Sequence, residues 1–235
     1  MLDHLFLDTV GALRTTLDAS LLERTGQDDR LVYDLLSGDL VWETSVTLPG
    51  DGDPPRVSAD LSLDWQIWSQ SAWRSLAMGE TVEDPPEIGI EIVFRAQRLA
   101  RRPALGTVLA ALPEESPDIG GEPLARSAPV VEESFEEEGG SPEVAVEVAY
   151  EGSYRLPPPG PAEDDTGGAG ALAGLREPRL SAGGPLGPSL GATRQVSAAI
   201  EATLNTLGTW LASTLVRLAD LDLDYLPPAE GPDNP

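Results

Sequence analysis

The sequence predicts an α+β fold in which an antiparallel β-sheet of four or five strands packs with an N-terminal and a long C-terminal amphipathic helix. Two observations predict this fold. Apolar residues recur at every second position in four segments between residues 40 and 151, and at every third or fourth position near both ends of the chain. Period two is typical of a half-buried strand, and a period near 3.6 is typical of a helix with one apolar stripe.

The N-terminal helix is predicted over residues 2–24. Its apolar side chains follow the helical spacing, and Gly26 is a suitable stop. Asp3 and Asp8 near the start and Arg24 near the end suit the helix dipole. The following segment, 31–36, is interpreted as a short helical turn. The predicted apolar stripe consists of Leu2, Leu5, Phe6, Val10, Leu13, Leu17 and Leu21.

Four strands are predicted from alternation. Residues 40–48 and 57–67 form a hairpin around a turn rich in Pro, Gly and Asp, and residues 88–96 and 144–151 supply the third and fourth strands. Each strand has one polar face, which indicates an antiparallel sheet covered on one side. By the same alternation, Trp65 points into the core and Trp68 points to the polar face.

The remaining segments define the predicted domain organisation. Residues 104–112 are compatible with a short helix or a strand. Segments rich in Pro and Gly bury too little apolar surface to offset their ordering entropy. The predicted units are a sheet domain over 1–156 with a mobile acidic loop at 113–142, a flexible linker over 157–191, an amphipathic helix over 192–226 and a disordered tail over 227–235.

The composition is strongly acidic. Forty Asp and Glu against fifteen basic residues, none of them Lys, give a net charge of −25. Such a surface repels phosphate groups, so we expect no nucleic-acid partner and no binding to anionic membranes. Excess carboxylates keep a protein soluble in a salt-rich cytoplasm, so we expect a halophilic, cytoplasmic protein; a GC-rich genome would also replace Lys by Arg. No apolar run reaches the roughly 20 residues of a transmembrane segment.

The residue types that usually carry catalysis are scarce. The chain has no Cys, which excludes thiol chemistry and zinc–thiolate sites, and no Lys, which excludes a Walker-type phosphate loop. The sole histidine, His4, lies beside the N-terminus, where a Ser-His-Asp triad is not expected. The acidic clusters at 51–53 and 220–224 do not match a calcium loop and are interpreted as solvated turns. We therefore predict no catalytic residues, no metal and no cofactor.

The C-terminal helix is the predicted interaction element. It carries no charge between Glu201 and Arg217, so much of its circumference requires burial against its own sheet, the first helix or another chain. The leading hypothesis is a non-enzymatic protein–protein interaction or assembly protein, with a β-sheet scaffold and an apolar helix surface that binds a partner or a second copy. The predicted interaction residues are Leu204, Leu207, Trp210, Leu211 and Leu215.

The alternative hypothesis is a carboxylate-dependent enzyme or small-ligand binder with a pocket near the segment from Trp65 to Trp73. Trp68, Gln70 and Arg74 are the candidate ligand-binding residues, because Trp and Arg are frequent in binding hot spots. The simpler interpretation is that the second helix covers Trp68 as part of the core. No residue pattern in the chain matches a family signature.

Overall fold

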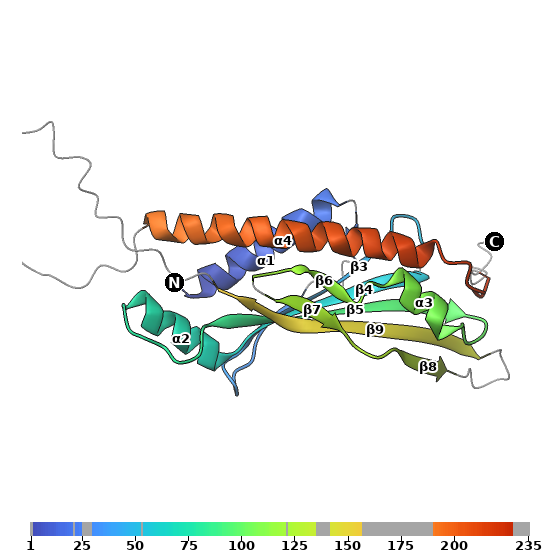
Figure 1. Cartoon of the computed structure of the whole chain (residues 1–235), viewed down its shortest axis with the longest axis horizontal. Coiled ribbons are helices and arrows are strands. Elements are labelled where there is room, and N and C mark those ends of the chain that lie inside the picture. Colours follow the sequence, from blue (N-terminus) through green and yellow to red (C-terminus); the bar gives the residue numbers. More distant parts are fainter. Residues whose placement is uncertain are drawn as a thin grey trace, which may run out of the picture.

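The computed structural model describes residues 2–20, 22–24, 30–52, 54–120, 122–134, 142–156 and 190–227. In this part of the chain, a nine-stranded antiparallel sheet is covered on one face by helices α1 (Leu2–Ala19) and α4 (Leu190–Ala219) (Figure 1). The predicted α+β fold is confirmed. The two helices come from opposite ends of the sequence and lie side by side across the sheet.

The centre of the sheet consists of the four predicted strands. They lie in the order β3 (Leu40–Thr47), β4 (Val57–Trp65), β5 (Glu87–Leu99) and β9 (Glu143–Arg155), each antiparallel to its neighbour. Apolar side chains alternate with polar ones along all four strands, so one face is buried beneath the helices and the other carries the polar residues.

Short strands extend the sheet at both edges. β1 (Glu23–Arg24) and β2 (Arg30–Tyr33) pair with β3. On the other side, β7 (Pro123–Arg126) and β8 (Val130–Ser134) pair with β9, and β6 (Glu115–Asp118) pairs with β7.

Three sequence predictions fail at these edges. The helix expected over 2–24 ends at Ala19, and its predicted last residues, Glu23 and Arg24, form strand β1. The helical turn expected at 31–36 is instead strand β2 and a turn, and much of the loop expected at 113–142 forms three strands. Stretches of four or five residues are too short for alternation to identify them. Their strand conformation depends on backbone hydrogen bonds to the long strands beside them.

Two further helices connect the strands. Helix α2 (Ile67–Ala77) begins two residues after β4, so the strand predicted to reach residue 67 ends earlier. Residues 104–112, predicted to be either a short helix or a strand, contain helix α3 (Leu105–Ala111). The backbone N–H of Ile67, the first residue of α2, donates to Asp39 Oδ1 at 2.7 Å. The acceptor for this helix N-terminus therefore comes from the segment between β2 and β3.

The core lies between the sheet and the two long helices. Phe6 of α1 stacks on Trp65 with ring centroids 6.0 Å apart, and Trp210 of α4 meets Phe94 and Tyr150 edge to face at 5.6 and 5.1 Å. Such aromatic pairs contribute roughly 0.5–1.5 kcal/mol each beyond the burial of their area. Both helices are therefore anchored to the sheet by aromatic side chains.

The end of α4 is tied to the sheet by backbone hydrogen bonds. Leu226 N–H donates to the Arg98 carbonyl and Ala100 N–H donates to the Asp224 carbonyl, both at 2.7 Å. Helix α4 ends at Ala219, before the predicted limit of 226, and an extended segment follows it. The predicted linker at 157–191 and tail at 227–235 lie almost entirely outside the described residues. No helix in the described residues is long and apolar enough to cross a membrane.

Candidate functional site

The turn between β2 and β3 exposes large apolar side chains. Leu35 and Leu36 are 87% and 99% exposed, although an isolated leucine of this kind would be unremarkable on a protein surface. Here they stand beside each other in the chain, and further exposed apolar side chains lie on β2 and at the start of α2. We call this surface the hairpin patch, and it consists of Leu31, Tyr33, Leu35, Leu36, Ile67 and Trp68, each at least 42% exposed.

The tip of the hairpin has a defined conformation. Asp34 Oδ1 accepts hydrogen bonds from the backbone N–H groups of Leu36 at 2.7 Å and Ser37 at 3.3 Å. These bonds favour the charged carboxylate and lower the pKa of Asp34. Gly38, at φ +81°, donates to the Asp34 carbonyl at 2.8 Å. The two leucines therefore project from an ordered turn.

Helix α2 braces this turn from the side. Asp39 Oδ1 accepts the Ile67 N–H, and the buried amide of Gln70 donates to the carbonyls of Gly38 at 3.0 Å and Trp65 at 2.8 Å. The hairpin tip, the end of β4 and the start of α2 are thus linked by side-chain hydrogen bonds. This arrangement joins the apolar residues of α2 to those of the hairpin.

An apolar groove adjoins the hairpin patch between α1 and β2. Its volume is about 350 Å³, and it is lined by Phe6, Leu7, Leu31, Tyr33 and Leu40. Phe6 and Leu40 are buried, whereas the other three side chains are 43–56% exposed at its sides. An apolar side chain of a partner protein would contact residues of this groove on several sides.

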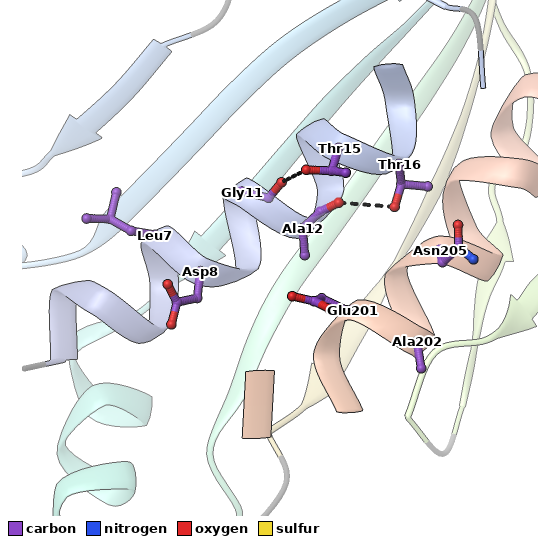
Figure 2. Close-up of a pocket in the computed structure, with 9 residues that line it drawn as sticks. All are labelled: Leu7, Asp8, Gly11, Ala12, Thr15, Thr16, Glu201, Ala202 and Asn205. Carbon is purple, nitrogen blue, oxygen red and sulfur yellow. Dashed lines mark hydrogen bonds between the residues drawn. The ribbon is translucent and has the colours of Figure 1, made fainter. Parts of the chain in front are cut away.

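A second hollow lies between α1 and α4, and we call it the helix cleft (Figure 2). Its volume is about 770 Å³, and Leu7 lines it as well as the groove. Close packing of the two helices at Thr16 and Gly208 gives way to small side chains, such as Gly11 and Ala202, towards the start of α1. The gap between the helices remains open there because these side chains do not fill it.

Two carboxylates flank the helix cleft. Asp8 lies on α1, and Glu201 extends from α4 towards α1 (Figure 2). The hydroxyl groups of Thr15 and Thr16 donate to the carbonyls of Gly11 and Ala12 in their own helix, at 2.9 and 3.0 Å. Side-chain oxygen atoms of Asp8, Glu201 and the two threonines therefore line the helix cleft.

The predicted interaction leucines of α4 have a structural role. Leu204, Leu207, Leu211 and Leu215 are all fully buried within the core of the chain. Trp210 belongs to the aromatic cluster over β5 and β9. A partner cannot reach the four leucines in this arrangement, and their role in partner binding stays a prediction.

The predicted ligand-binding residues lie on α2 and do not converge. Trp68 is 42% exposed and its indole N–H donates to Gln66 Oε1 at 2.6 Å, Gln70 is buried, and Arg74 is exposed. Both sequence-based interpretations of Trp68 are wrong, because it belongs to a helix and not to a strand face, and because it is not covered by α4. Trp68 and its chain neighbour Ile67 are both 42% exposed at the start of α2, and this exposure is the feature that remains.

Sequence reasoning missed the hairpin patch itself. Leu35 and Leu36 stand between Asp34 and the Ser37-Gly38 pair, in a segment whose flanks are typical of a turn. Two adjacent leucines inside such a turn are the signal that could have identified the patch. That signal was obscured because an apolar run at 31–36 also fits a helical turn.

Several carboxylates lie on the open face of the sheet, and some of them form ion pairs with arginine. Arg95 lies 2.7 Å from Glu147 and 3.7 Å from Asp60. A shallow hollow of about 660 Å³ nearby includes Glu91 and Glu151. In the described part of the chain, no group of three or more suitable side chains could hold a metal ion.

No protein-family model, no curated protein and no solved structure matches this chain.

Proposed function

We propose that this chain is a non-enzymatic protein–protein interaction protein, in which the sheet is a scaffold and the hairpin patch contacts another protein. The observation that carries this proposal is the almost complete exposure of Leu35 and Leu36 on a turn fixed by Asp34, Asp39 and Gln70. Exposed apolar surface grouped in this way is characteristic of interaction sites.

The energetics support the same conclusion. Burying a leucine side chain contributes roughly 1.5–3 kcal/mol, so Leu35 and Leu36 together could contribute about 3–6 kcal/mol. A micromolar complex requires about 8 kcal/mol, and further patch residues add to the total. Because the turn is already ordered by its own hydrogen bonds, binding does not have to fix its backbone.

The acidic composition supports a salt-rich cytoplasm as the setting and favours a different protein over a second copy as partner. Two chains of charge −25 repel each other over distances set by the Debye length. Of the two kinds of assembly, self-association therefore requires high salt, whereas binding to a partner of opposite charge does not.

The proposal is tested by affinity capture from a lysate of the source organism. We expect the intact chain to retain a partner in stoichiometric amount, and the double variant Leu35→Ser, Leu36→Ser to lose at least nine-tenths of it. The matched control is Val130→Ser, which removes a 54% exposed apolar side chain from β8 at the opposite edge of the sheet. Equal retention by the double variant and the control would contradict the proposal.

The ligand-binding alternative near Trp68 has less support. The Gln70 amide donates to two carbonyl groups of the chain, and burial keeps this side chain from the surface. Its role is to join the turn to α2.

A further inference from the structure

Strand β2 lies at the edge of the sheet with one side open. Among the described residues it pairs only with β3, and no strand lies along its other side. The edge strands across the sheet are protected from further pairing, because β6 contains Pro117 and β8 carries Glu132 and Glu133. Strand β2 has neither a proline nor a carboxylate, and its Leu31 and Tyr33 are 46% and 56% exposed.

A hydrogen bond of the hairpin shows which backbone groups of β2 face the open edge. The N–H of Asp34 donates to the carbonyl of Asp39 at 2.9 Å, so the backbone groups of Asp34 point towards β3. Successive residues of an antiparallel strand direct their N–H and C=O groups to alternate sides. Tyr33 and Leu31 therefore direct both backbone groups to the open edge.

The segment from Arg30 to Asp34 is complementary to itself in antiparallel orientation. When two copies pair about Val32, Arg30 of each copy lies opposite Asp34 of the other, and Leu31 lies opposite Tyr33. This register joins the outward backbone groups, so each pair of Leu31 and Tyr33 exchanges two hydrogen bonds. Arg30 and Asp34, both exposed, form pairs of opposite charge across the strands. A shift by one residue opposes outward to inward groups, and a shift by two separates the charges.

We propose that two copies of this chain associate through β2, with a twofold axis beside Val32, and so form one continuous sheet. The interface is isologous, because the same residues contribute from both copies. Leu31 and Tyr33 cover one another at the join, beside the groove that each copy lines with Phe6 and Leu7. The net charge of −25 opposes the contact, so we expect dimers in molar potassium chloride, where the repulsion is screened, and single chains in 0.1 M salt.

A cysteine cross-link tests the register directly, because the chain has no cysteine of its own. In the proposed dimer the two Val32 residues face each other in a pair without hydrogen bonds, with Cα atoms about 4.5 Å apart. A disulfide can span this distance. Under mild oxidation in 2 M potassium chloride, we expect Val32→Cys to give at least tenfold more covalent dimer on non-reducing electrophoresis than Val130→Cys, a control at a 54% exposed position of β8. Equal yields would overturn the proposal.

A pair of substitutions at Tyr33 tests the backbone hydrogen bonds. Tyr33→Pro removes an N–H that faces the open edge and leaves the bonds between β2 and β3 in place. Tyr33→Ala removes the same apolar side chain but keeps the N–H. Light scattering in 2 M potassium chloride measures dimer dissociation, and circular dichroism checks that both variants fold. We expect a dissociation constant at least tenfold higher for Tyr33→Pro, and equal constants for the two folded variants would contradict pairing through this edge.

A charge reversal tests the pairs of Arg30 and Asp34. Arg30→Glu places a carboxylate opposite each Asp34 of the dimer, whereas Arg102→Glu makes the same change of charge at an exposed position between β5 and α3. In the same light-scattering experiment, we expect Arg30→Glu to raise the dissociation constant about tenfold and Arg102→Glu to raise it less than twofold. Equal effects would overturn the register.

Self-association through β2 goes beyond the partner binding proposed above, and the two proposals fail separately. Leu35 and Leu36 lie beyond the paired segment. If Val32→Cys gives no more covalent dimer than Val130→Cys while the Leu35 and Leu36 double variant loses its partner, only the dimer is wrong. If Val32→Cys cross-links as expected and the double variant retains its partner, only the interaction function is wrong.

Discussion

Tyr150 shows how a polar side chain is accommodated in this core. Its ring is fully buried, and its hydroxyl donates to the carbonyl of Pro113. Burial raises the pKa of Tyr150 to about 12, and the positive charges of Arg126 and Arg217 lower it only in part. The native structure therefore requires this phenol to keep its proton.

This requirement predicts a loss of stability at high pH. The unfolded tyrosine has a pKa of about 10, so the stabilisation is fully present below pH 10 and is lost as the pH rises to about 12, by roughly 1–2 kcal/mol. Unfolding with guanidinium chloride at pH 9 and at pH 11.5 measures this loss of stability. Tyr150→Phe should be less stable at pH 9, because Pro113 loses a donor, but should lose less on going to pH 11.5. Equal losses of stability in the original chain and in Tyr150→Phe would rule out Tyr150 as the origin of the effect.

At the scale of elements, the contact between α1 and α4 depends on two glycines with opposite surroundings. A Cβ at Gly208 would lie 2.0 Å from Thr16 Cγ2, whereas a Cβ at Gly11 would meet no atom within 4 Å. Gly208 lets the helices touch, and Gly11 contributes to the open cleft beside that contact. Both residues are inside helices, where glycine is intrinsically unfavourable.

The same substitution should therefore act in opposite directions at the two sites. Gly208→Ala forces the helices apart and should destabilise the fold by about 1–3 kcal/mol, despite the better helix propensity of alanine. Gly11→Ala meets no obstacle and should stabilise it by about 0.5–1 kcal/mol. Thermal unfolding followed by circular dichroism provides the comparison, and a stabilising Gly208→Ala would disprove the close contact.

At the scale of the whole molecule, charge sets the response to salt. The chain carries −25, and several carboxylates share the open face of the sheet, where Glu91 pairs directly opposite Glu151. Like charges in register destabilise a sheet, and their repulsion is screened within about 3 Å in molar salt.

We accordingly expect the unfolding temperature to rise by several degrees between 0.1 M and 2 M potassium chloride. Light scattering on the same samples reports the mass of the particle. A control variant, Glu91→Gln, should show a smaller rise because it removes one of the opposed pair. An unfolding temperature that is independent of salt would contradict the halophilic interpretation.

Alternation in the sequence predicted the long strands because each buries one complete face. The pattern from Val57 to Trp65 is a clear case, and its inward residues are buried as expected. Local patterns cannot reveal contacts between distant segments. Asp39 satisfies the N–H of Ile67 across a connection, and Thr16 meets Gly208 from the other end of the chain. The groove and the cleft arise from such contacts, so they emerge only in three dimensions.

The pairing of the first and last helices has a consequence for synthesis in the cell. Ribosomes add roughly 5–20 residues per second, so α4 emerges roughly 10–40 s after α1. During that interval α1, whose Leu13 and Leu17 are fully buried in the finished protein, lacks the helix that packs beside it. The nascent chain therefore passes through a long aggregation-prone period, and its strong negative charge, which keeps unfinished chains apart, is of most value before folding is complete.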